Sequence, residues 1–238
     1  MFPIALGELV QLFRNRSVLV TMFVLPVAFS ALYIYLYEAV AVFDLGAIAA
    51  ILLFLVLAMG YYTTTVTTLA ARRQNLFLKR LRSTAASDTR ILTGLLLPVT
   101  GVAVLQLTVI LTVLGVVAGA PGNALLLVVA VVTTVVMMLC LGLATAGVTN
   151  SPEHAQVTTL PVLIGTMAVS GWVGFTGTEE LTLVKRVLPG GAASELVVAA
   201  WDGGVAVAES LVLLAPTVGW VVVSVALAAR LFRWEPRR

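Results

Sequence analysis

Few side chains in this sequence could carry out chemistry, and they stand far apart. The 238 residues include a single histidine, His154, and a single cysteine, Cys140. Nucleophilic catalysis needs a base beside the nucleophile, and a structural metal site needs several nitrogen or sulfur ligands. No stretch matches Gly-x4-Gly-Lys-Ser/Thr, the loop that binds nucleotide phosphates. We therefore expect a chain that is not an enzyme, with no catalytic residue, no metal site and no cofactor of its own.

A cluster of hydroxyl side chains over residues 61–68 is the strongest candidate for ligand contact. It contains two tyrosines and five threonines. Two interpretations are open. The threonine hydroxyls can bond to carbonyls of their own helix, which makes them tolerable in lipid. Alternatively, Tyr61, Thr64 and Thr68 share one helix face and, with Thr67, form a mildly polar wall of a substrate pathway.

These residues must be positioned by helices that lie in a membrane. Residues 91–152 form a run of 62 residues without one Asp, Glu, Lys or Arg. A soluble domain cannot hide that much apolar length from water, whereas about 20 apolar residues cross the hydrocarbon core of a bilayer. The composition agrees, with 61% hydrophobic residues, 11% charged residues and a mean hydropathy of +1.10. The sequence thus predicts an all-α integral membrane protein.

Six charge-free apolar runs predict six transmembrane helices in a single transmembrane domain, residues 1–238. The runs are 17–37, 45–71, 91–119, 124–149, 155–174 and 211–229. Basic residues mark cytoplasmic segments, and cytoplasmic termini put 12 of the 14 Lys and Arg residues inside. We therefore expect both termini, with the tail 230–238, in the cytoplasm. Because the basic residues lie at span ends and form no surface stripe, nucleic acid is not an expected partner.

Two segments outside the spans have a pattern of their own. Residues 1–16 place Leu6 and Phe13 with other apolar residues at helical spacing, which indicates an amphipathic interfacial helix or a lead-in turn of the first span. Residues 175–210 are moderately apolar, but their apolar run 192–201 has about ten residues and is too short to cross a bilayer, which needs about 20. They predict outward re-entrant or interfacial helices between spans 5 and 6, broken by Pro189 and Gly190, with Trp201 at headgroup level.

The segment 72–90, between spans 2 and 3, is the most charged in the chain. It interleaves four apolar with three basic residues, and this pattern predicts a short amphipathic cytoplasmic helix: Leu76, Phe77, Leu78, Lys79, Arg80, Leu81 and Arg82. Asp88 is the expected N-cap of the next span. The charges could anchor the two span ends against anionic lipid, or the apolar cluster could dock a partner protein.

Several short motifs occur in a familiar order. Glu8-Leu9, Leu12-Phe13-Arg14-Asn15-Arg16 and Pro26 come first, Leu81-Arg82-Ser83-Thr84 lies between spans 2 and 3, and Ser170-Gly171 and Leu188-Pro189 flank the outer segment. In this layout the chain resembles the ABC type-2 exporter permeases, the family of the daunorubicin-type drug exporters and polysaccharide exporters. The likeness extends over nearly the whole chain.

The resemblance implies a half-transporter. A second permease chain, identical or related, would complete the pathway, and separate nucleotide-binding ATPase subunits would hold ATP and Mg. Residues 76–82 would couple the ATPase to a permease that exports a lipophilic or drug-like substrate, with multidrug efflux and antibiotic resistance as the implied roles. High Ala, Val and Arg with low Lys indicates a bacterial source, hence the bacterial cytoplasmic membrane. A motor-independent channel or facilitator, and a structural membrane protein, stay open as alternatives.

Overall fold

The computed structural model describes residues 2–37, 44–84, 87–177, 180–203, 206–232 and 234. Within these ranges, 86% of the residues are helical and no strand occurs. Six helical segments of the described residues are long and apolar enough to cross a membrane, which confirms the predicted all-α fold with six spans. Their bounds are Arg16–Tyr35, Leu45–Gln74, Asp88–Val117, Ala124–Val148, Pro152–Thr176 and Ala208–Leu231. The helix ends differ from the predicted ones by a few residues, because several helices continue past the apolar run into polar residues.

The first span follows a separate helix, α1 (Phe2–Arg14). Asn15 separates α1 from the first span, because its side chain accepts a hydrogen bond from Val18 N (3.3 Å) and caps the helix that begins at Arg16. The span then consists of α2 (Arg16–Leu19), the π-helical segment η1 (Val20–Val24) and α3 (Leu25–Tyr35). In α1, Ala5 and Leu12 are buried against the bundle, whereas Leu6, Val10 and Phe13 are exposed on another side of the helix. Placement of α1 at the membrane interface stays a prediction.

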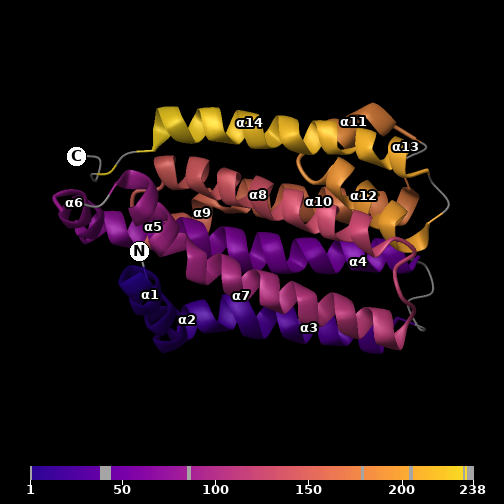
Figure 1. Ribbon diagram of the computed structural model, residues 1–238, viewed down its shortest axis with the longest axis horizontal. Helices are drawn as coiled ribbons and strands as arrows, with labels where there is room; N and C mark the ends of the chain where they lie inside the picture. The colour runs from indigo at the N-terminus through magenta and orange to yellow at the C-terminus, as the bar shows by residue number, and fades with distance from the viewer. Residues whose placement is uncertain are drawn as a thin grey trace.

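Span 2 is the centre of the bundle. It is one continuous helix of 30 residues, built from α4 (Leu45–Phe54), the π-helical η2 (Leu55–Tyr62) and α5 (Thr63–Gln74). The structure buries 89% of its most apolar window, against 17% to 50% for the other spans. Its π-helical part crosses η1 closely, because a Cβ at Gly60 would lie 3.0 Å from the carbonyl oxygen of Met22. Figure 1 shows the span with helices packed on both sides.

Spans 3 and 4 belong to different packed groups around span 2. Span 3 is α7 (Asp88–Val117), which packs against α1 and α3, and span 4 is α8 (Ala124–Val148), which packs against α14 (Leu214–Leu231) and α12 (Gly191–Asp202). The side chain of Ser87 accepts a hydrogen bond from Arg90 N (3.4 Å) and caps α7. The prediction that Asp88 is the N-cap is therefore wrong by one residue, since Asp88 is already helical.

Span 5 consists of α9 (Pro152–Thr158) and α10 (Leu160–Thr176), and Ser151 caps its start by accepting from His154 N (3.2 Å). The predicted break between spans 4 and 5 is thus confirmed. Helix α11 (Thr182–Val187) precedes α12, and the short helix α13 (Val207–Val212) overlaps the start of the last span. Helices α11 and α12 form the helical segment expected between spans 5 and 6; whether it enters the membrane stays a prediction.

The two ends of the bundle differ in charge. Both termini and the short helix α6 (Phe77–Arg82) lie at one end, and α11, α12 and α13 lie at the other (Figure 1). Nine basic residues of the described ranges belong to the terminal end: Arg14, Arg16, Arg72, Arg73, Lys79, Arg80, Arg82, Arg90 and Arg230. The opposite end has Lys185 and Arg186. In the predicted cytoplasmic tail 230–238, Arg233, Arg237 and Arg238 lie outside the described residues. Which side of the membrane each end faces stays a prediction.

Candidate functional site

The first candidate site is α6, the predicted coupling helix, at the terminal end of span 2. The helix begins after Leu76, whose backbone is left-handed (φ 55°) and turns the chain sharply away from α5. Leu76 is 46% exposed and Leu78 is fully buried. Phe77 and Leu81 are half-buried, and the three basic residues Lys79, Arg80 and Arg82 are exposed. The surface that α6 presents therefore combines one leucine with three cations, and Leu78 holds the helix against the bundle.

Arg72 fastens the start of α6 to α1. Its guanidinium donates to a carboxylate oxygen of Glu8 at 2.7 Å and to the side-chain oxygen of Gln11, and it lies 5.4 Å above the ring of Phe77. Glu8 is buried despite its charge. A buried pair of this kind costs about 3–5 kcal/mol to break from one side, because the remaining charge is left without compensation. The ion pair thus holds α1, span 2 and α6 together.

Arg73, the next residue, fastens span 2 to span 4. Its side chain is 2% exposed and donates to the carbonyl oxygen of Ala146 at 2.9 Å and to that of Thr149. Both carbonyls belong to the end of α8, where helix carbonyls have no partner within the helix and the helix dipole is negative. The Arg73 guanidinium therefore donates hydrogen bonds to these carbonyls and also compensates the negative end of the α8 dipole.

The far end of α6 is also held. Arg82 pairs with Asp88 at 3.3 Å, and its guanidinium lies 5.2 Å from the ring of Trp234, in the segment after the last span. Trp234 in turn packs edge-on against Phe232, with ring centroids 5.6 Å apart. Three separate parts of the chain therefore fix the orientation of α6: the N-terminal helix, the start of span 3 and the C-terminal segment.

The second candidate site is a cavity of about 320 Å³ at the terminal half of the bundle, between spans 1, 2 and 5. No charged side chain lines it. Hydroxyl and amide groups alternate there with apolar ones: Ser17, Val18, Thr21, Met59, Thr63, Thr64, Thr67, Pro152, Ala155, Gln156, Thr159, Leu160 and Leu163. A smaller cavity of about 190 Å³ shares Val18, Thr67 and Pro152 with it and extends to Thr68, Glu8 and Arg72. We call the two together the threonine cavity.

Several hydroxyls of this cavity already donate a hydrogen bond. Thr67 donates to Thr63 O (2.8 Å), Thr159 to Ala155 O (2.7 Å) and Thr21 to Ser17 O (3.0 Å), each within its own helix. A hydroxyl that donates still has oxygen lone pairs to offer. The larger part of the cavity therefore presents hydrogen-bond acceptors and apolar surface without charge, whereas the smaller part also contains the paired charges Glu8 and Arg72.

Three of the four predicted pathway residues line this cavity, and one does not. Thr64 and Thr67 line its larger part, and Thr67 and Thr68 its smaller part. Tyr61 lines neither; it is fully buried, and its hydroxyl lies 2.8 Å from that of Thr100 on span 3. The structure places Tyr61 in the helix core for this reason. The sequence could not reveal the difference, because the partner lies 39 positions away.

The predicted residues of the outer segment form a packed junction. Gly190 precedes α12 with φ 100°, and a Cβ there would lie 3.1 Å from the Phe54 ring. Pro189 belongs to the turn before it. Trp201 is 3% exposed, so its ring is packed inside the protein and does not face headgroups. The backbone amides of Gly122 and Asn123, between spans 3 and 4, donate to the carbonyls of Trp201 and Ala200, each at 2.9 Å.

Two further charged groups secure this end. Lys185 is buried and donates to Thr176 Oγ1 (2.7 Å) and to Gly177 O (2.6 Å), at the end of α10. Asp202 Oδ1 accepts from the backbone amide of Gly46 (2.8 Å), in the first turn of span 2. Partial burial raises the pKa of Asp202, and the nearby charge of Asp44 raises it further, although the hydrogen bond opposes both. The sequence prediction named none of the charges Glu8, Arg72, Arg73 and Lys185 as a site residue. Arg72, Arg73 and Lys185 lie in the last turns of their helices, which is a local signal, whereas Glu8 lies in the middle of α1 and has none.

The described residues contain no group of three or more His, Cys, Asp and Glu side chains that could hold a metal ion. Comparison with known proteins gives one match: a family model described as ABC-2 type transporter matches residues 4–176. No curated protein and no solved structure matches the chain. The matched stretch runs from α1 to the end of α10, so it includes α6 and every residue of the threonine cavity.

Proposed function

The chain belongs to the ABC-2 type transporter family and is a multi-pass membrane permease subunit, and from this premise we propose that it is one half of an ATP-driven exporter. A separate ATPase subunit binds at α6 and supplies the energy. A second permease chain completes the pathway, and the substrate is a lipophilic or drug-like molecule. Both termini face the cytoplasm in this arrangement, as the excess of basic residues at their end favours.

The proposal rests on the contacts that hold α6 in a fixed orientation on the bundle. A short helix that served only to connect two spans would need neither the contact of Phe77 with Arg72, which is paired to α1, nor the cation–π contact of Arg82 with Trp234 in the C-terminal segment. The exposed surface of α6 offers one apolar anchor, Leu76, among the cations Lys79, Arg80 and Arg82. Such a surface suits a partner groove that is acidic at its rim and apolar at its centre, because complementary charges steer association and buried apolar anchors supply affinity.

The threonine cavity supports the substrate pathway and the second chain. Ser17, Thr21 and Gln156 are exposed at its mouth, although they belong to candidate membrane spans. Polar groups at a span surface favour association with another helical chain over contact with lipid, because interhelical hydrogen bonds can satisfy them. The larger part of this cavity has hydroxyl acceptors, apolar side chains and no charged lining residue, and it suits a neutral or amphipathic substrate with hydroxyl or N–H donors.

The test of the partner site compares two sets of variants. Leu76→Asp combined with Arg80→Glu changes the exposed surface of α6, and Arg14→Glu changes a matched exposed cation on α1. We expect ATPase activity to co-purify with the unchanged chain and with Arg14→Glu. The α6 variant should retain about a tenth of that activity or less, as expected when at least 1.4 kcal/mol of binding is lost. Equal co-purification by both variants, or ATP hydrolysis by the purified chain alone, contradicts the proposal.

A second measurement separates the exporter from a channel. The complex is reconstituted in liposomes with a lipophilic dye as substrate, and transport is followed with and without ATP. Transport that continues without ATP and without the ATPase identifies a motor-independent channel. Native mass spectrometry of the complex counts the permease chains, and a single permease chain per complex contradicts the two-chain pathway. Thr64→Val should change substrate preference, whereas Thr133→Val on span 4, outside the threonine cavity, should not.

A further inference from the structure

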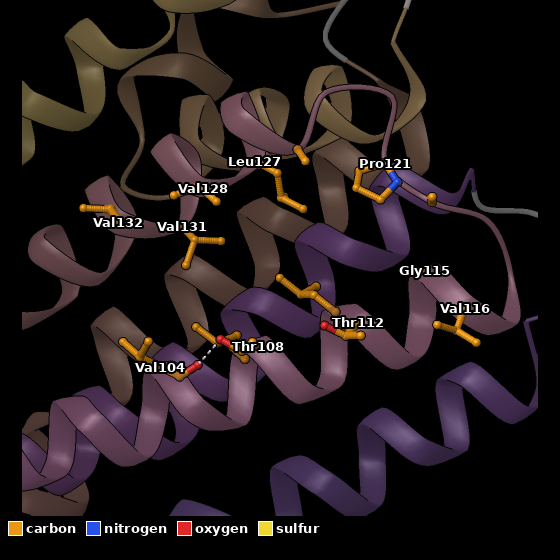
Figure 2. A pocket seen from close by; sticks show the side chains of 14 residues that line it. Val104, Thr108, Thr112, Gly115, Val116, Pro121, Leu127, Val128, Val131 and Val132 are labelled. Atoms are coloured by element: carbon orange, nitrogen blue, oxygen red, sulfur yellow. Dashed lines mark hydrogen bonds between the residues drawn. The ribbon is translucent and has the colours of Figure 1, made fainter.

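Spans 3 and 4 enclose a second cavity, which the proposed function does not use. The two helices α7 and α8 are consecutive and joined by a short turn, yet they make few contacts with each other. Between them runs a groove of about 500 Å³ (Figure 2). Its lining comes from the half of each span that lies away from the termini: Val104, Leu107, Thr108, Leu111, Thr112, Gly115, Val116, Ala120, Pro121, Ala124, Leu127, Val128, Val131 and Val132.

The packing of the bundle holds this α7–α8 groove open. Helix α7 packs against α1 and α3, whereas α8 packs against α12 and α14, so the two walls belong to different groups of helices. The turn between them is fixed to a third element, since Gly122 N and Asn123 N donate to carbonyls at the end of α12. The groove therefore lies at the boundary between two groups of packed helices, α1, α3 and α7 on one side and α8, α12 and α14 on the other.

The lining is suited to hydrocarbon and to little else. It contains no charged residue, and the only side-chain polar atoms among its lining residues are the hydroxyls of Thr108 and Thr112. Thr108 donates to the carbonyl oxygen of Val104 at 2.8 Å, drawn as a dashed line in Figure 2. The leucines Leu107 and Leu127 are buried at the floor, whereas Val116 is 81% exposed at the rim. A water-soluble ligand would find almost no hydrogen-bond partner here.

The dimensions of the groove select its occupant. From Val104 to Val116 the helix rises 12 residues, or about 18 Å at 1.5 Å per residue, close to half of a hydrocarbon core about 30 Å thick. A volume of about 500 Å³ over that length gives a mean cross-section of about 28 Å² and a width of about 6 Å. A transmembrane helix of a second copy is about 10–12 Å across, so it could place only side chains in the groove and would leave the helix itself outside. An extended hydrocarbon chain, whose atoms sit about 4 Å from their neighbours, fits.

We propose that the α7–α8 groove binds one acyl chain of a membrane lipid, from the leaflet that faces away from the termini. The proposal rests on the six membrane spans and is independent of the proposed exporter function. The bound chain fills the groove between the two helix groups and completes the packing of spans 3 and 4.

The experiment places the full chain in vesicles of phosphatidylethanolamine and phosphatidylglycerol with a trace of phosphatidylcholine that has a photoreactive diazirine on one acyl chain. After illumination, mass spectrometry of peptides locates the lipid adducts. We expect them to concentrate on residues 104–116 and 124–132, in excess of other lipid-exposed segments. Thr112→Phe fills the groove and should lower these adducts several-fold. Val113→Phe adds the same bulk to an exposed neighbour that does not line the groove and should leave them unchanged.

Three results would overturn the proposal. Adducts spread evenly over all exposed spans mean that the groove does not select a lipid chain. Equal labelling of the Thr112→Phe and Val113→Phe variants means that the adducts form elsewhere. A Val128→Cys, Cys140→Ala variant that forms a disulfide between two copies means that another protein chain covers the groove. If Thr112→Phe does not fold, electron paramagnetic resonance of a spin-labelled phosphatidylcholine bound to the unchanged chain decides, and absence of a motionally restricted lipid population refutes the site.

Discussion

Replacing Arg73 by methionine tests whether a buried cation really holds the ends of spans 2 and 4 together. The side chain is 2% exposed and donates to the carbonyls of Ala146 and Thr149. Methionine keeps most of the apolar stem, so the change removes mainly the charge and the donors. Each charge-assisted hydrogen bond contributes about 1.5–3 kcal/mol, and leaving a buried carbonyl without a partner adds to the loss. We expect a loss of about 3–5 kcal/mol in the free energy of unfolding.

The assay is unfolding in mixed micelles by titration with sodium dodecyl sulfate, followed by circular dichroism. Arg90→Met provides the matched control, because Arg90 is an exposed arginine at the same end of the bundle. Arg90→Met should lower the free energy of unfolding by less than about 0.5 kcal/mol, as is usual for exposed positions. The free energy of unfolding of Arg73→Lys should lie between those of the two methionine variants, since lysine keeps the charge but not the planar arrangement of donors. Arg73→Met as stable as Arg90→Met refutes the reasoning.

Three other predictions concern the two ends of span 2. A Cβ at Gly46 would lie 2.5 Å from Oδ2 of Asp202, so Gly46→Ala should destabilise the folded chain by about 1–3 kcal/mol in thermal unfolding. In the control variant Gly101→Ala, no atom lies within 4 Å of the added Cβ, and the folded chain should gain up to about 1 kcal/mol. Equal effects of the two variants would refute the clash. Because the pKa of Asp202 is raised, the folded chain keeps that proton to higher pH than the unfolded chain, and stability should fall as pH rises from about 4 through the raised pKa. Asp202→Asn keeps the acceptor and should flatten this dependence; an unchanged slope would contradict the assignment. Glu8→Gln should leave Arg72 without its counter-charge and speed hydrogen exchange throughout α1, and unaltered exchange there would show that the pair does not anchor the helix.

The number and approximate position of the spans could be predicted from sequence, because lipid tolerates long charge-free helices and few other structures. Helix ends were less predictable. Asp88 and Ser87 are both good capping residues, and the choice between them depends on one backbone hydrogen bond, that from Arg90 N to Ser87. Length and composition thus determine the helices, whereas local geometry determines their ends.

The residues of the sites were predicted with mixed success for a physical reason. The pattern of residues 76–82 indicates an amphipathic helix, but it does not say which leucine faces the bundle, and Leu78 turned out to be buried. The pair between Glu8 and Arg72 spans 64 positions, so no local pattern could join them. The threonines 64, 67 and 68 were recognisable because hydroxyls stand out in an apolar run, whereas Tyr61 has the same chemistry but packs inward.

Span 2 is fastened at both of its ends and surrounded along most of its length. Gly46 is bonded to the helix α12 at one end, and Arg72 and Arg73 are bonded to α1 and α8 at the other. At 1.5 Å per residue, its 30 residues form a strut about 45 Å long. A rigid helix that is held at both ends can transmit a displacement along its axis as one body, without successive small shifts of side chains. If a partner protein pushes on α6, as the proposed function requires, span 2 would carry the displacement toward α12, and its π-helical part η2 is where the helix would bend first.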